Sequence, residues 1–65
     1  MGEKARLDRI IESYETSPEQ YQHNVWQCYS ECKKEIVKMQ GEGLVGTDSK
    51  SYMDLIEYVT GRLAI

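Results

Sequence analysis

Apolar side chains recur every three or four residues in three separate segments of this 65-residue chain. That spacing matches the 3.6-residue turn of an α-helix and differs from the alternation of a half-buried strand. The stripes consist of Leu7, Ile10, Ile11 and Tyr14, then Tyr21, Val25, Cys28, Tyr29, Cys32, Ile36 and Met39, and finally Tyr52, Leu55, Ile56, Val59 and Leu63. The pattern predicts an all-α protein.

The break between the first and second segments carries the strongest boundary signal. Ser17 is a suitable N-cap, because its hydroxyl can accept from the free amide groups of the next turn. Pro18 suits the first helical position, and Gln20 completes a capping-box pattern. We therefore expect the first helix at about 3–15 and the second at about 18–40, which makes the second the longest element.

The second break is glycine-rich and reads GEGLVG. Gly41 or Gly43 can take the left-handed backbone conformation that closes a helix. We expect the apolar pair Leu44 and Val45 to tuck under the helix ends. The following TDS offers Thr47, Asp48 or Ser49 as the N-cap of a third helix at about 49–63.

Three stripes and two short connections predict one domain, residues 1–65, built as a small antiparallel three-helix bundle with a long central helix. A core of this size supplies only roughly 3–5 kcal/mol of stability. Small domains commonly add to that by self-association, so a homodimer is left open.

Two cysteines allow at most one internal disulfide, which is too few for a disulfide scaffold. We find neither a signal peptide nor an apolar run of about 20 residues that could span a membrane. These observations predict a cytoplasmic protein without a membrane partner.

The net charge of −3 does not offer the basic face that phosphate backbones select. A helix-turn-helix reader would use the third helix, whose exposed side carries Asp54 and Glu57 against Lys50 and Arg62. Direct binding to nucleic acid is therefore disfavoured. The acidic third helix leaves open an alternative function, in which the surface imitates nucleic acid to block a nucleic-acid-binding protein.

The sequence contains no recognisable catalytic or cofactor-binding pattern. Cys28 and Cys32 stack on one helix face, but a structural zinc site needs four ligands and the sole histidine, His23, points elsewhere on a helix. A bundle this small also leaves little room for an enclosed substrate cavity. We therefore expect no enzyme activity, no metal and no cofactor, with a thiol- or metal-linked oligomerisation switch as a further alternative.

The remaining signal is apolar surface beside the main stripes. Trp26 and Val37 lie roughly 100–120° from the stripe of the second helix, and Met53 and Tyr58 flank that of the third. Tyr and Trp are enriched where proteins meet. Together with Tyr29, these residues predict a protein-binding surface on a small non-enzymatic regulator or inhibitor. The competing interpretation is that Trp26 belongs to the core.

Overall fold

The computed structural model describes residues 2–16 and 24–65, which form three α-helices and no strand. Helix α1 spans Glu3–Thr16, α2 spans Val25–Gly41 and α3 spans Ser49–Leu63. The predicted all-α class with three helices is confirmed. Within these ranges, no helix combines the length and the apolar content that a bilayer crossing requires.

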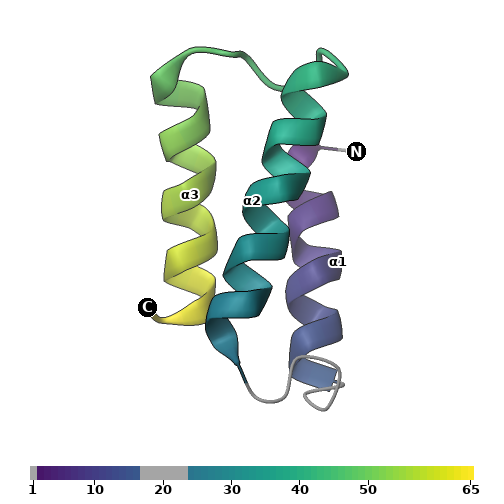
Figure 1. The fold of residues 1–65 in the computed structure, drawn as a ribbon, viewed down its shortest axis with the longest axis vertical. Coiled ribbons are helices and arrows are strands. Elements are labelled where there is room, and N and C mark those ends of the chain that lie inside the picture. The colour runs from purple at the N-terminus through teal and green to yellow at the C-terminus, as the bar shows by residue number, and fades with distance from the viewer. Residues whose placement is uncertain (1, 17–23) are drawn as a thin grey trace.

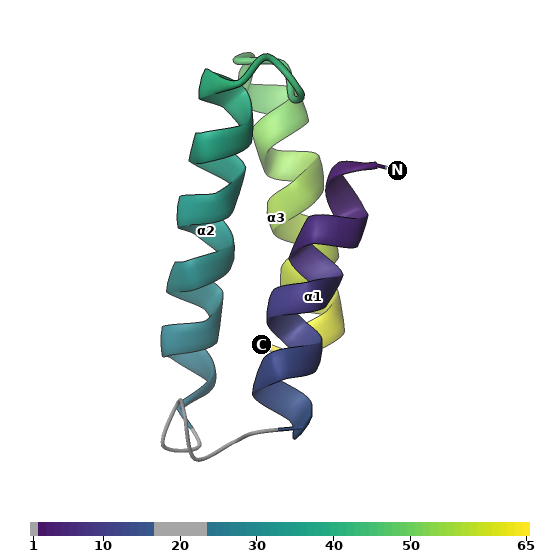
Figure 2. The same ribbon diagram turned by 90° about the vertical axis from the view of Figure 1, so that its right-hand side faces the viewer.

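Each helix packs against the other two. In Figure 1, α2 ends at the upper end of the molecule, where residues 42–48 lead into α3. Helices α1 and α3 both end near the lower end. The view turned by 90° shows α2 and α1 at the two sides with α3 behind them (Figure 2).

The core lies where the three stripes meet. Its buried side chains are Leu7, Ile11, Cys28, Cys32, Ile36, Met39, Val45, Leu55, Ile56 and Val59. All of them except Val45 belong to the predicted stripes. Further stripe members, such as Ile10 and Tyr52, pack against this core and are partly buried. Hydrophobic burial along a 3.6-residue period therefore accounts for the packing of all three helices.

Helix α2 begins later than the sequence predicts. Asn24 has an extended backbone (φ −96°, ψ 97°), and its side-chain oxygen accepts a hydrogen bond from the Trp26 amide at 3.0 Å. Asn is among the best N-cap residues, so it sets the start of the helix at Val25. Because Asn24 is not helical, the expectation of one continuous helix over about 18–40 is wrong. With 17 residues, α2 is little longer than its neighbours. The predicted cap at Ser17 lies outside the described residues.

The turn after α2 decides between the two candidate glycines. Gly43 has φ +80°, its amide bonds to the carbonyl of Gln40, and the Leu44 amide bonds to the carbonyl of Met39. This pair of hydrogen bonds is the Schellman motif, which needs a left-handed residue at the position of Gly43. Val45 is buried as expected, but Leu44 is 58% exposed, so the expectation that both would tuck inward is wrong for Leu44.

Asp48 starts α3, as one of the three predicted N-caps. Its carboxylate accepts from the Ser51 amide at 2.9 Å and from the Ser51 hydroxyl at 2.8 Å. These hydrogen bonds lower the pKa of Asp48 below its usual value. A Cβ on Gly46 would lie only 2.5 Å from Asp48 Oδ1, so a side chain at this position would displace the capping carboxylate.

Candidate protein-binding surface

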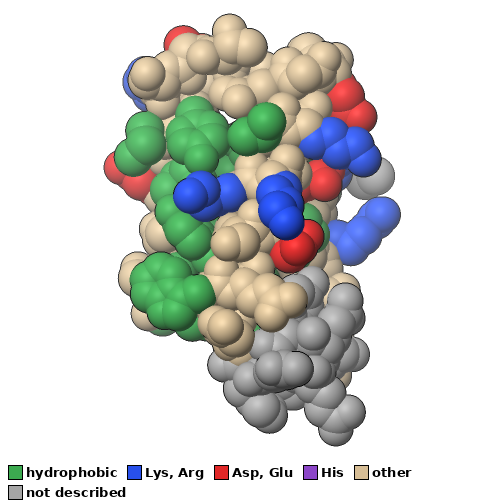
Figure 3. Space-filling view, viewed as in Figure 1, with side chains coloured by type: hydrophobic (Ala, Val, Ile, Leu, Met, Phe, Trp, Pro, Cys, Tyr) green, Lys and Arg blue, Asp and Glu red, His purple; other side chains and the backbone are tan. Residues whose placement is uncertain are grey.

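Exposed apolar side chains gather on the side of the molecule formed by α2 and α3. Trp26 and Val37 on α2 are 61% and 57% exposed, and Met53 on α3 is 50% exposed. Figure 3 shows hydrophobic side chains over α3 and its seam with α2, with positively charged side chains among them. We call this the α2/α3 face and define it by Trp26, Tyr29, Ser30, Lys33, Lys34, Val37, Tyr52 and Met53.

Trp26 occupies the first turn of α2, two positions after the Asn24 cap. Its ring meets the half-buried ring of Tyr29 edge-on, with 5.9 Å between centroids and 88° between planes. Edge-to-face contacts of this kind are favourable by roughly 0.5–1.5 kcal/mol. Trp26 is therefore a surface residue that contacts Tyr29, and it is not part of the core of the single chain.

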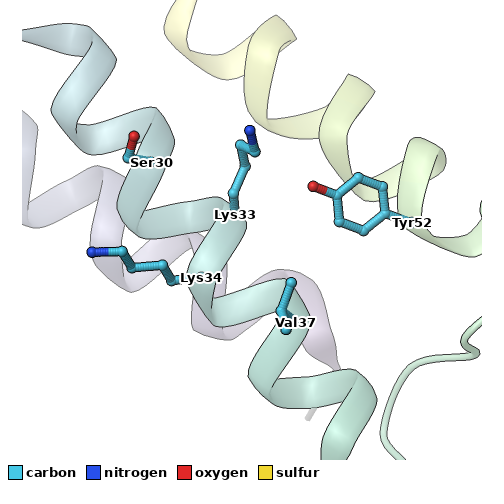
Figure 4. A pocket seen from close by; sticks show the side chains of 5 residues that line it. All are labelled: Ser30, Lys33, Lys34, Val37 and Tyr52. Carbon is cyan, nitrogen blue, oxygen red and sulfur yellow. The ribbon is translucent and has the colours of Figure 1, made fainter.

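A groove lies between α2 and α3 on the same face. It measures about 420 Å³, is open to solvent, and is lined by Ser30, Lys33, Lys34, Val37 and Tyr52. Lys33 and Tyr52 reach into the space between the two helices from opposite sides, whereas Lys34 points away along the other side of α2 (Figure 4). The volume falls in the range of ligand sites, but the groove is a shallow trough and not the enclosed cavity that most substrate sites use.

The lining of the groove is positively charged. Lys33 Nζ lies 5.4 Å from the centroid of the Tyr29 ring, an arrangement in which the ring attracts the cation. Lys34 forms a long ion pair with Glu31 at 3.8 Å. Among the described residues that line the groove there is no carboxylate, histidine or thiol, so none of them forms an acid–base pair there.

The five residues predicted for binding do not all share this face. Trp26, Tyr29 and Val37 follow one side of α2, and Met53 stands on the neighbouring helix. Tyr58 instead lies between α3 and α1: its hydroxyl donates to Asp8, and Lys4 Nζ lies 5.1 Å from its ring centroid. The structure therefore gives Tyr58 an internal contact with α1.

The predicted binding surface did not include four residues that line the groove: Ser30, Lys33, Lys34 and Tyr52. The first two could have been found, because Trp26, Ser30, Lys33 and Val37 recur at intervals of four, three and four on a helix. The prediction used only the apolar residues on this side of the second helix, so Ser30 and Lys33 were left out. The contribution of Tyr52 depends on how α3 packs against α2, which helix periodicity does not specify.

The cysteine pair lies on the opposite, buried side of α2. Cys28 and Cys32 are free thiols with no exposed surface. Burial raises the pKa of both, that of Cys32 to about 12, so neither forms the reactive thiolate at neutral pH. Within residues 2–16 and 24–65, no three His, Cys, Asp or Glu side chains are grouped as metal ligands; His23 lies outside these ranges.

The acidic side of α3 carries an internal ion pair. Lys50 Nζ lies 3.0 Å from Asp54 Oδ2, one helical turn away, which offsets part of the negative charge there. A nucleic-acid mimic would need an uncompensated acidic surface.

Comparison with known proteins found no match: no family model, no curated protein and no solved structure matches the chain.

Proposed function

We propose that this chain is a non-enzymatic antiparallel three-helix bundle that binds another protein through the α2/α3 face. The proposed role is that of a cytoplasmic regulator or inhibitor, which covers the working surface of a larger partner. The observation that carries the proposal is the exposure of Trp26, in edge-on contact with Tyr29, on the same side of α2 as Val37.

Two physical arguments support this proposal over the alternatives. A solvent-exposed tryptophan leaves a large apolar surface in water, and Trp is among the residue types that are enriched in binding hot spots. The thiol-linked switch is less well supported, because both sulfur atoms are buried and their raised pKa values disfavour reaction. The mimic is less well supported because Lys50 already pairs with Asp54.

The test compares three purified chains as baits for an extract of the source cells: the wild type, Trp26→Ala and Leu44→Ala. Leu44 is a matched control, since it is also an exposed apolar residue (58%) but lies in the loop after α2. We expect a defined protein to be retained by the wild type and by Leu44→Ala and lost with Trp26→Ala. Val37→Asp should abolish the same binding.

Circular dichroism of each variant separates a binding defect from unfolding. Because Trp26 and Val37 are exposed, we expect helicity and melting temperature close to those of the wild type. If Trp26→Ala unfolds the domain, or if it retains every protein that the wild type retains, the proposal fails.

A further inference from the structure

We infer that the partner of the α2/α3 face presents an acidic amphipathic helix, whose apolar side chains cover Trp26, Val37 and Tyr52 and whose carboxylates pair with Lys33. This inference rests on the proposed function and names the chemistry of the partner. It combines the shape of the groove with the distribution of charge around it.

The groove is a positive site on an acidic protein. The whole chain has a net charge of −3, yet the described residues that line the groove include two lysines and no acid. Lys33 forms no ion pair with any carboxylate of the described residues; its nearest described electrostatic partner is the Tyr29 ring. An ammonium group has three donors, so Lys33 retains the capacity to bind an incoming carboxylate.

The neighbouring charges leave this site uncompensated. Glu31 is the described acid paired with a lining residue, and it pairs with Lys34, which points away from the space between the helices. A partner that buries Val37 and Tyr52 therefore also covers Lys33. Covering a lysine without supplying an opposite charge is costly, so a carboxylate is the complementary group.

The apolar anchors fit a helix in a groove. Trp26 and Val37 are eleven positions apart on α2, which corresponds to about 16 Å along the helix axis. A partner helix of about three turns spans the same length and can place apolar side chains at both ends. Lys33 lies between the two anchors in sequence, so a carboxylate near the middle of the partner helix would meet it.

The positive charge of Lys33 also argues against a second copy of this chain as the partner that covers the α2/α3 face. A two-fold interface uses one patch on both subunits, so self-association through this face would cover the Lys33 of each subunit while the described lining of the groove offers no carboxylate to pair with it. Phosphate backbones are disfavoured too, because two lysines beside apolar side chains give few of the cationic contacts on which nucleic-acid affinity depends.

The test uses two synthetic helical peptides of about 18 residues, a length that supports helix formation. Both carry the same leucine and tryptophan stripe; one is flanked by glutamates and the other by lysines. Each is titrated into the full, isotope-labelled chain and followed by amide chemical shifts. We expect only the acidic peptide, and not the basic one, to change the amide chemical shifts of Lys33, Val37 and Tyr52. The affinity of the acidic peptide should fall as salt is added.

Charge reversal identifies the contact. Lys33→Glu should lower the affinity for the acidic peptide by about tenfold or more. Lys38→Glu should lower it much less, because Lys38 lies on the same helix but is not among the described residues that line the groove. Lys33→Gln provides a milder variant with little risk to folding. The amide spectrum of each variant confirms that the fold is retained.

Several results would overturn the inference: no shift with the acidic peptide, equal binding of both peptides, or an unchanged affinity in Lys33→Glu. Sedimentation that shows a dimer dependent on Trp26 would assign the face to a second copy instead. If a captured partner depends on Trp26 but not on Lys33, the proposed function stands and the acidic partner is wrong. If the partner depends on neither residue, both proposals fail.

Discussion

The Tyr58 hydroxyl donates a hydrogen bond to the Asp8 carboxylate and so joins α3 to α1 across 50 positions of sequence. Arg62 pairs with the same carboxylate and approaches Glu15 at 3.7 Å. Lys4 adds its cation over the Tyr58 ring. A partly buried polar cluster therefore holds the first and third helices together beside the hydrophobic core.

Replacing Tyr58 with Phe should destabilise the fold by about 1 kcal/mol, because it removes a hydrogen bond to a charged group and keeps the ring. Urea unfolding followed by circular dichroism measures the change. Tyr52→Phe is the matched control, since that hydroxyl lies at the groove on the other side of α3. Equal unfolding midpoints for the two variants would show that the bond to Asp8 contributes nothing.

Alkaline pH should destabilise the protein through Cys32. The folded chain holds the pKa of this thiol at about 12, against 9.0 for an unperturbed thiol. Between these values the unfolded chain loses the proton and the folded chain keeps it, so stability falls as the pH rises, by up to about 1.4 kcal/mol per pH unit. Below pH 9 this contribution is constant.

Cys32→Ala isolates this effect from other groups that titrate at high pH. Its free energy of unfolding, measured from pH 8 to pH 11, should fall less steeply than that of the wild type, although the variant is less stable at pH 8 from lost packing. Parallel curves for the two chains would refute the assignment to Cys32.

Acid should weaken the start of α3. The hydrogen bonds from Ser51 lower the pKa of Asp48, so its contribution is complete above the pKa of the unfolded carboxyl and is lost as the pH falls through the lower, folded value. Asp48→Asn keeps a cap acceptor without the charge. We expect its melting temperature to fall less than that of the wild type between pH 7 and pH 3.

Asp54→Asn serves as the control for the acid experiment, because it also removes one carboxylate from α3 but leaves the cap intact. If Asp54→Asn flattens the acid response as much as Asp48→Asn, loss of negative charge explains the result and the cap does not.

Two glycine-to-alanine changes should act in opposite directions. At Gly46 a Cβ would collide with Asp48 Oδ1 at 2.5 Å and meet Ser51 Oγ at 3.0 Å, which displaces the cap and lowers the melting temperature. At Gly61, inside α3, a Cβ meets open space, and alanine should stabilise the helix by up to about 1 kcal/mol. Thermal unfolding of both variants checks the pair.

The helices and most of the core could be predicted because burial follows a local period. The stripe that contains Cys28, Cys32 and Ile36 becomes the buried side of α2, as the angles require. The start of that helix was harder to predict. A continuous stripe through Tyr21 favoured a start at Ser17, and Asn24 was not recognised as a cap, although it is the N-cap of α2.

The surface was less predictable, because it depends on which helix lies beside which. Tyr58 and Met53 both flank the stripe of α3, yet only packing decides that Tyr58 meets Asp8 of α1 while Met53 stays exposed. Leu44 and Val45 are neighbours of similar chemistry, and the Schellman turn at Gly43 directs one outward and the other inward.

The two buried thiols have a practical consequence. Since neither sulfur reaches solvent in the folded chain, an alkylating reagent can modify Cys28 or Cys32 only during a transient opening of the bundle. The alkylation rate therefore reports the transient opening of the bundle without any introduced label. A ligand that binds only the folded state would slow that rate, so the native cysteines would report occupancy of the distant α2/α3 face.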